Sequence, residues 1–442
     1  MTRRLISILQ SYLQRPGIRS SAINSGWLLL DKLTRLVGGL IVGIWVARYL
    51  GPNAYGIFGY ALSLSGIVGV FGLLGLDAIM VRWLVRYPKH AGTLLGSALV
   101  IRLLATTLCM VGLGLWGFGF EQQLNLTGLG LIGLGLLVQP ATIFRFAFDA
   151  KLQSGTIVKI ELTAYLLCAL LKLGLIAVSA PLVWFIGVFA LETVLGVVGI
   201  VLFFGKRFGL ETCRFNTRTT ALLFRHGLPL ILTGSATMIY MRIDQVMLPM
   251  MSTAHEAGLY AAATRLSELW SFIPAAFSAS AAPAIIRARQ HQPQLYKDRL
   301  QRLASFLMLL AFGIIAVVSG GSRWLIPLLY GDHYLGAIPM LTIHTFGLIG
   351  IFQIYATHIF FTSEKLNHHL AVLLWGVALV NIGLNAVLLP RWGGIGAAVA
   401  TAFTYSIALP VSAIVFKKTR PIFWMSLNAL RLKGLFSKNL LH

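Results

Sequence analysis

Ten ionisable side chains lie inside otherwise apolar segments of this chain, and their chemistry bears most directly on function. A charged side chain at the centre of a bilayer costs at least about 2.5–3.5 kcal/mol unless it faces water or a partner, so such residues are candidates for binding or transport. The cations are Lys32, Arg35, Arg102, Lys172, Arg242 and Arg265, and the anions are Asp31, Glu192, Asp244 and Glu268.

Two of the possible pairs have the spacing of ion pairs within a helix. Asp31 and Arg35 are separated by four residues, and Arg265 and Glu268 by three, so each pair lies on one helix face. These pairs are therefore either partly structural or part of a functional site.

Two of the cations have no obvious local partner. Lys172 and Arg102 lack an acidic residue within a helical turn. A group of fixed cations attracts a polyanion such as pyrophosphate, to which Arg offers a bidentate contact and Lys a point charge. We therefore predict that the six cations bind substrate. One of the four anions is expected to bind a coupling ion, with Asp31 or Glu192 favoured, although Glu192 can equally pair with Lys172 across helices.

These residues lie on about twelve apolar stretches, each near the ~20 residues that a helix needs to cross a ~30 Å hydrocarbon layer. Of the 36 Lys and Arg residues, 27 lie at the termini and in every second gap, and only three lie in the intervening gaps. Because cytoplasmic loops retain basic residues, both termini are predicted to be cytoplasmic. The expected spans are 23–49, 55–76, 92–117, 126–146, 160–179, 181–204, 227–250, 256–285, 303–329, 335–362, 367–390 and 393–416.

Composition excludes a soluble protein. Hydrophobic residues make up 57% of the chain and charged residues 11%, with a mean hydropathy of +0.81. The formal charge of +23 suits the anionic inner leaflet better than nucleic acid. The fold class is therefore an all-α polytopic membrane protein.

A long basic gap divides the spans into two sets of six. Tyr55–Phe58 and Ala257–Tyr260 each begin the second span of their half and are offset by 202 residues, which indicates an internal repeat. Because each half has an even number of spans, the two lobes would be related by a pseudo-twofold axis along the membrane normal, with a central cleft between them. The predicted parts are a cytoplasmic N-terminal segment 1–22, an N-lobe 23–204, a cytoplasmic linker 205–226, a C-lobe 227–416 and a cytoplasmic basic amphipathic tail 417–442.

No pattern in the chain indicates an enzyme. The three cysteines show no CxxC spacing, and the ten histidines form no metal-binding pattern. The sequence Gly128–Gly133 fits GxGxxG but lies in an apolar span, where small residues favour helix packing. We expect no metal, no cofactor and no catalytic residue.

The first loop reads ARYLGPNAYG over Ala47–Gly56. It resembles the ARYLGP-x-x-YG signature of the polysaccharide biosynthesis transporters, the O-antigen-type flippases, and Trp27–Lys32, Tyr240–Asp244 and Gly258–Trp270 add similar stretches. The resemblance implies the fold of the multidrug/oligosaccharidyl-lipid/polysaccharide exporter superfamily, in which two six-helix lobes form a V. Its motif residues, read as structural or gate elements, are Arg48, Gly51, Pro52, Tyr55 and Gly56.

The resemblance also implies a function. It is the export of a polyprenyl-pyrophosphate-linked oligosaccharide, such as an O-antigen unit of lipopolysaccharide or an exopolysaccharide unit, across a bacterial inner membrane. Transport would be by ion-coupled alternating access in a monomer, with membrane lipids and a glycan polymerase complex as further partners and no nucleic acid. The alternatives are a multidrug/cation antiporter of the same fold and a non-transporting membrane partner of a glycan assembly complex.

The predicted topology is tested at the gap between the lobes. In a background without native cysteines, Thr217→Cys should resist an impermeant thiol reagent in intact spheroplasts and react after lysis. Labelling from outside would reverse the orientation.

Overall fold

The computed structural model describes residues 16–119, 124 and 126–435, which form helices and connecting turns without a β-strand. Ten helices of this described part are long and apolar enough to cross a membrane, and the predicted all-α multi-pass membrane protein is confirmed. Residues 1–15 of the predicted N-terminal segment 1–22 lie outside the described residues, as do residues 436–442 of the predicted tail 417–442.

The chain divides into two compact units. One contains the described residues up to Val46 together with Val68–Ile231, and the other contains Ala47–Ile67 and the described residues from Leu232 onward. Two long helices, α2 (Pro16–Leu73) and α9 (Thr217–Met251), contribute to both. The predicted lobe boundaries and the linker 205–226 stay predictions.

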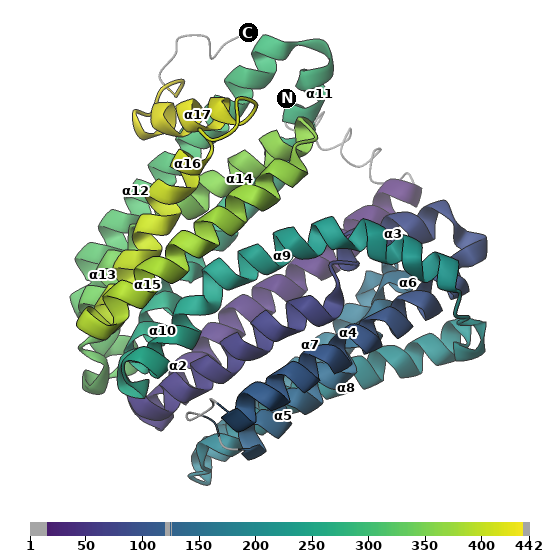
Figure 1. The fold of residues 1–442 in the computed structure, drawn as a ribbon, viewed down its shortest axis with the longest axis horizontal. Coiled ribbons are helices and arrows are strands. Elements are labelled where there is room, and N and C mark those ends of the chain that lie inside the picture. Colours follow the sequence, from purple (N-terminus) through teal and green to yellow (C-terminus); the bar gives the residue numbers. More distant parts are fainter. Residues whose placement is uncertain (1–15, 120–123, 125, 436–442) are drawn as a thin grey trace, which may run out of the picture. The chain divides into compact units, whose positions relative to one another are not determined.

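The first unit contains two short helices and several longer ones. Its remaining elements are α3 (Asp77–Arg86), α4 (Ala91–Gly119), α5 (Leu126–Val138), the 3₁₀ segment η2 (Gln139–Phe144), α6 (Arg145–Ala150), α7 (Ser154–Ala177) and α8 (Leu182–Phe208). Helices α7 and α8 lie side by side (Figure 1). Phe144 stacks on Phe204 with ring centroids 4.4 Å apart, inside a buried core that also includes Leu76, Met80 and Phe148.

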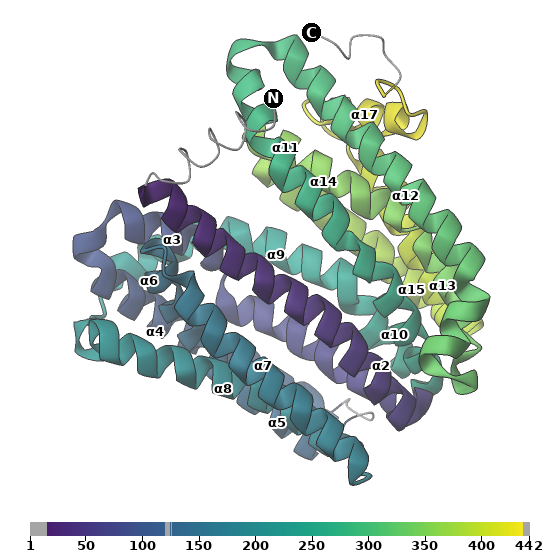
Figure 2. The same ribbon diagram turned by 180° about the vertical axis from the view of Figure 1, so that it is seen from behind.

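The second unit is a helical bundle with a shorter helix near the end of the chain. Its elements are α10 (Ala254–Glu268), α11 (Phe272–His291), α12 (Pro293–Tyr330), α13 (Ala337–Thr345), α14 (Leu348–Ser363), α15 (Asn367–Phe403), the π-helical segment η6 (Thr404–Ala408), α16 (Leu409–Ser412) and α17 (Arg420–Leu430). Helices α11, α12 and α14 pack against one another (Figure 2).

Two of the membrane helices are long enough for two crossings each. Ile23–Leu73 has 51 residues and Asn367–Ser412 has 46, whereas about 20 suffice to span the hydrocarbon layer. Each is broken by a glycine with a positive φ, Gly51 (φ 68°) and Gly393 (φ 51°), a conformation that side chains with a Cβ rarely adopt. These breaks fall at or beside the predicted gaps, and the count of twelve crossings stays a prediction.

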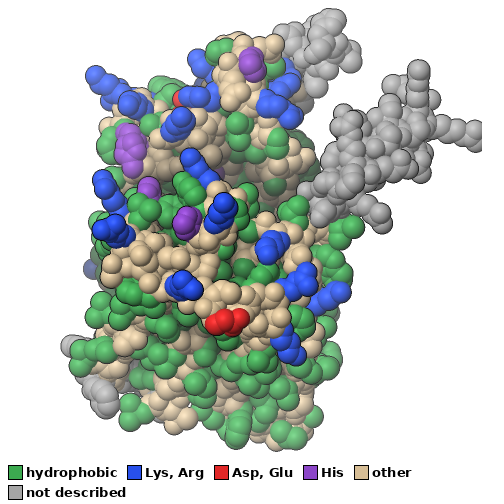
Figure 3. Space-filling view, turned by 90° about the vertical axis from the view of Figure 1, so that its right-hand side faces the viewer, with side chains coloured by type: hydrophobic (Ala, Val, Ile, Leu, Met, Phe, Trp, Pro, Cys, Tyr) green, Lys and Arg blue, Asp and Glu red, His purple; other side chains and the backbone are tan. Residues whose placement is uncertain are grey.

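Basic side chains outnumber acidic ones on one face of the molecule. On the face drawn in Figure 3, Lys and Arg side chains are visible in many places and acidic ones in few, while other parts of the face are hydrophobic. This distribution accords with the formal charge of +23.

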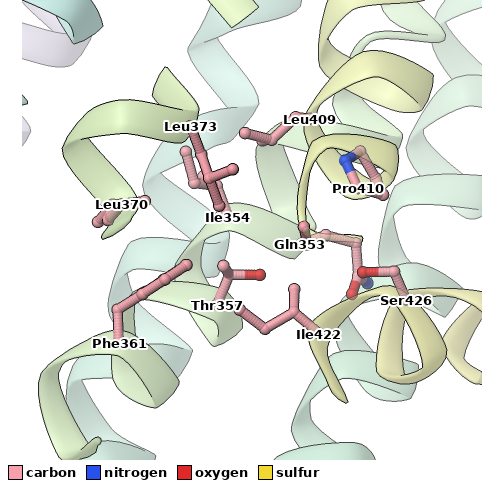
Figure 4. A pocket seen from close by; sticks show the side chains of 11 residues that line it. Gln353, Ile354, Thr357, Phe361, Leu370, Leu373, Leu409, Pro410, Ile422 and Ser426 are labelled. Atoms are coloured by element: carbon pink, nitrogen blue, oxygen red, sulfur yellow. The ribbon is translucent and has the colours of Figure 1, made fainter. Parts of the chain in front are cut away.

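Helix α17 buries one of its faces. Ile422, Met425 and Ala429 are buried in the core of the second unit, whereas Trp424 is mostly exposed. Beneath this helix a small pocket is lined mainly by aliphatic side chains, and Gln353 and Ser426 lie at its polar side (Figure 4). The amide nitrogen of Gln353 donates to the carbonyl oxygen of Ala304 at 2.8 Å.

The first-loop motif packs against the start of α10 through two glycines. A Cβ added to Gly56 would overlap the carbonyl oxygen of Ala254, and one added to Gly258 would overlap that of Pro52. The contact is reciprocal, because Pro52 and Gly56 correspond to Ala254 and Gly258 at the same offset of 202 residues. All four residues belong to the second unit. We call this contact the glycine seam.

Further contacts hold the motif in place beside the glycine seam. The hydroxyl of Tyr334 donates to the carbonyl oxygen of Ala47 at 2.7 Å, and Arg48 Nη2 donates to that of Leu328 at 2.7 Å. The ring of Tyr55 meets Tyr334 edge-on, with centroids 6.4 Å apart. The motif residues therefore have structural contacts that explain their types, and a role as a gate stays a prediction.

Replacing either seam glycine tests this packing. Because the added methyl would meet backbone atoms, Gly56→Ala and Gly258→Ala should each lower stability by about 1–3 kcal/mol, measured by thermal unfolding in detergent. Gly112→Ala is the matched control: nothing lies within 4 Å of its Cβ position, and alanine favours a helix by up to about 1 kcal/mol over glycine. Equal melting temperatures for the three variants would contradict the close contact.

Candidate functional site

Three helices of the first unit bring charged side chains together. Asp31 and Arg35 lie one turn apart on α2, Lys172 lies on α7, and Glu192 lies on α8. The residues were predicted separately as substrate-binding or ion-coupling groups, and the structure places them in one connected set of ion pairs. We call this set, with the Arg145 contacts described below, the Arg35 network.

Arg35 is the centre of this network. Its Nε donates to Asp31 Oδ1 at 2.8 Å, which confirms the pair predicted from the four-residue spacing. Its Nη1 donates to Glu192 Oε1 at 3.1 Å, and its Nη2 donates to the backbone carbonyl of Glu161 at 3.2 Å. The guanidinium also lies over the ring of Tyr165, 5.2 Å from the centroid. One arginine thus connects three helices.

Glu192 holds two cations at once. Its Oε1 accepts from Arg35, and its Oε2 lies 3.5 Å from Lys172 Nζ. The pairing of Glu192 with Lys172 across helices, which the sequence left open, is confirmed. The carboxylate therefore has a cation on each oxygen and is not an isolated acid.

A second arginine extends the network. Arg145 Nη1 donates to both carboxylate oxygens of Glu161, at 2.8 and 3.0 Å, and its Nε lies 3.4 Å from Asp149 Oδ2. Asp149 also accepts from the hydroxyl of Ser154 at 2.5 Å. The backbone carbonyl of the same Glu161 contacts Arg35, so Glu161 joins the two arginines.

Sequence reasoning missed this second arginine and its partners. Glu161 stands at the start of the predicted span 160–179 and Arg145 at the end of the predicted span 126–146, and neither was among the ten charges singled out from the sequence. The four-residue spacing of Arg145 and Asp149 was an available signal. Their contact with Glu161 depends on how α6 and α7 pack, which spacing along the chain does not reveal.

The Arg35 network carries a small excess of negative charge. Its ion pairs join three cations, Arg35, Arg145 and Lys172, to four carboxylates. The carboxylates are Asp31, Asp149, Glu161 and Glu192. With every group ionised, the network has a formal charge of −1, so it is not a field of unneutralised cations.

Arg102 lies apart from this network and is fully buried. Its side chain has 0% exposure and pairs through Nη2 with Asp77, whose side chain is 49% exposed. Its Nη1 is 3.5 Å from the hydroxyl of Thr142, and its Nε has no hydrogen-bond partner among the described residues. A ligand cannot reach this guanidinium without a rearrangement, so Arg102 ties α4 to α3 and η2 in this structure.

The second unit holds a separate polar cluster. Arg242 on α9 pairs with Glu268 on α10 at 3.2 Å. Asp244 is buried, with hydrogen bonds from the hydroxyl of Tyr260, from that of Thr401 at 3.1 Å, and from the backbone N–H of Gln245 at 2.7 Å. Among the ion pairs of the described residues, Asp244 takes part in none.

Two predicted substrate-binding residues have exposed side chains. Lys32 on α2 is exposed, and its ammonium takes part in none of the ion pairs between described residues. Arg265 on α10 is also exposed. Their roles as substrate-binding residues stay predictions.

Comparisons with known proteins give consistent matches. The family described as "Polysaccharide biosynthesis protein" matches residues 45–339. The chain is 26% identical over 417 residues to the "Probable flippase AglR" of Haloferax volcanii, covering 88% of this chain and 81% of that protein.

Solved structures share the fold at low identity. An inward-facing multidrug resistance MATE family transporter of the MOP superfamily aligns with a TM-score of 0.63 at 14% identity, over 91% of this chain and 96% of that one. The lipid II flippase MurJ, in an inward closed conformation, aligns with a TM-score of 0.62 at 13% identity, over 91% of each chain. A MOP superfamily transporter from Pyrococcus furiosus, described as having a binding pocket of reversed polarity, aligns with a TM-score of 0.60 at 15% identity, over 94% of this chain and 96% of that one.

The buried pair of Arg102 and Asp77 predicts an asymmetric response to mutation. Asp77→Ala leaves an uncompensated buried cation and should cost about 3–5 kcal/mol of stability. Arg102→Met leaves only a half-exposed carboxylate, which water can solvate, and should cost less. Thermal unfolding in detergent measures both, with Asp298→Ala, an exposed carboxylate, as control. A larger loss for Arg102→Met than for Asp77→Ala would contradict this assignment.

Proposed function

We propose that this chain, which belongs to the polysaccharide biosynthesis protein family, is a flippase that moves a polyprenyl-pyrophosphate-linked oligosaccharide across a bacterial inner membrane. The family match, the probable flippase among its relatives and the transporter fold support a lipid-linked glycan as the substrate class. The oligosaccharide is an O-antigen or exopolysaccharide unit, and transport is by alternating access in a protein with both termini in the cytoplasm.

The observation that carries this proposal is the sharing of Glu192 by two cations. Arg35 and Lys172 approach one carboxylate from α2 and α7. A pyrophosphate presents oxygens on two linked phosphorus atoms, so it can replace the carboxylate on both cations. Arg35 supplies Nη1, which now donates to Glu192, to one phosphate, and Lys172 supplies a point charge to the other.

Charge balance links this exchange to ion uptake. The Arg35 network already has a formal charge of −1, and a pyrophosphate adds more negative charge. The displaced Glu192 carboxylate would be left without a cation in an apolar region, which is costly. Uptake of a proton by Glu192 removes that cost, so substrate binding and protonation occur together.

Asp31 and Asp244 are the other carboxylates to compare with Glu192. Asp31 accepts a hydrogen bond from Arg35 Nε, and the proposed exchange leaves this hydrogen bond intact. Asp244 has neutral donors around it and is suited to hold a proton or a monovalent cation, but it lies in the other unit from Arg35. Among the residues that the structure describes, Glu192 is the carboxylate that forms ion pairs with both Arg35 and Lys172, so we assign the coupling to Glu192.

The charged residues of the Arg35 network also bear on the two alternative functions. Four carboxylates in the Arg35 network also suit an organic cation, so a multidrug/cation antiporter of this fold is the nearest rival. A non-transporting partner of a glycan assembly complex is the other, and it requires none of these charges for transport.

Transport by charge-neutralised variants separates the three functions. In proteoliposomes with a fluorescent lipid-linked oligosaccharide, Arg35→Gln or Lys172→Gln should each weaken binding about 10- to 100-fold, and the double variant should lose translocation. Lys206→Gln, at the exposed end of α8, is the matched control. Full translocation by the double variant would overturn the proposal, and export of an organic cation in place of the lipid would favour the antiporter.

The proposed exchange also predicts how Glu192→Gln alters the pH dependence of pyrophosphate binding. A neutral amide mimics the protonated acid and releases both cations, so Glu192→Gln should bind farnesyl pyrophosphate more tightly than the wild type at pH 8. The wild type should bind farnesyl pyrophosphate more tightly at pH 6 than at pH 8. This change in affinity should exceed the change measured with Glu192→Gln, which reports the titration of the ligand itself. Identical pH dependence in the two proteins would contradict coupling through Glu192.

A further inference from the structure

We infer that Tyr165 and Gly38 are positioning residues for Arg35, so that they set the affinity of the proposed site for a pyrophosphate without touching it. This inference rests on the proposed function only in the identity of the ligand. Its structural basis is the stacking of the Arg35 guanidinium over the Tyr165 ring, at 5.2 Å from the centroid.

Gly38 provides the space that the tyrosine occupies. Asp31, Arg35 and Gly38 follow one another at helical spacing, so they share one face of α2. A Cβ at Gly38 would lie 2.7 Å from the hydroxyl oxygen of Tyr165 and 3.4 Å from its Cε1. The phenol therefore lies against the α2 backbone, one turn beyond Arg35, and any larger residue at position 38 would displace it.

The contacts of Arg35 with α7 come from a single turn of that helix. Arg35 Nη2 donates to the carbonyl oxygen of Glu161, and the guanidinium face lies over Tyr165, four residues later. In an α-helix these two positions are joined by a backbone hydrogen bond. The carbonyl and the ring therefore form one rigid support for the arginine.

This support fixes which donors remain for a ligand. The guanidinium carbon lies over the Tyr165 ring, and the Glu161 carbonyl and Asp31 accept from Nη2 and Nε. Nη1, which donates to Glu192, is the donor that the proposed exchange transfers to a phosphate. Because the arginine is already held at three places, the exchange needs little loss of side-chain freedom, which for an unrestrained arginine costs up to about 2 kcal/mol.

A double-mutant cycle separates positioning from general stability. The probe is farnesyl pyrophosphate, titrated into the purified protein in detergent. With Arg35 present, Tyr165→Leu and Gly38→Ala should each weaken binding about 3- to 30-fold, as expected for loss of a cation–π contact. Tyr165→Phe keeps the ring and should restore binding to within about twofold.

The decisive comparison is the same pair of changes in an Arg35→Gln background. There, Tyr165→Leu and Gly38→Ala should have no further effect, because no guanidinium remains to be positioned. Equal losses in both backgrounds, or a loss with Tyr165→Phe as large as with Tyr165→Leu, would overturn the inference. If Arg35→Gln itself leaves binding unchanged, the proposed function fails at that step; if it weakens binding while Tyr165→Leu does not, only this inference fails.

Discussion

An ionised side chain within a hydrocarbon layer is stable only beside water or an opposite charge, and the first unit meets this constraint with connected ion pairs around Arg35. Each polar edge of that guanidinium has an acceptor, on α2, α7 or α8, so one residue holds three helices in register. In the proposed exchange, a ligand that takes Arg35 and Lys172 leaves the carboxylate of Glu192 without a cation, and the gain of a proton or another cation by Glu192 removes that cost. The same ion pairs therefore hold the helices of the first unit together and take part in the proposed exchange with the substrate.

The sequence predicted the local part of this arrangement and not the part that depends on packing between helices. The pair of Asp31 and Arg35 follows from helix geometry, and it is present. The partner of Lys172 was left open, since it lies on another helix, and Glu161 was overlooked because its role depends on a contact with Arg145. Composition and hydropathy alone were enough for the fold class, because the constraints of a bilayer act on every residue of a span.

The second unit shows a different consequence of close packing. The glycine seam brings two backbones together at equivalent positions of the repeat, where Pro52 faces Gly258 and Ala254 faces Gly56. The short sequence similarity thus coincides with a close backbone contact, and the internal repeat itself stays a prediction. Gly51, whose positive φ ends the first half of α2, places Pro52 at the start of the next helical segment, which explains the Gly-Pro pair of the motif.

The central claim is that a pyrophosphate and a proton are bound together, because the ligand displaces Glu192 from Arg35 and Lys172. Calorimetric titration of farnesyl pyrophosphate into the detergent-solubilised protein, repeated in buffers that differ in ionisation enthalpy, counts the protons taken up. The account predicts about one more proton taken up per ligand by the wild type than by Glu192→Gln, since a carboxylate left without a cation in an apolar region gains a proton. Equal proton uptake by the two proteins, with binding retained, would contradict it.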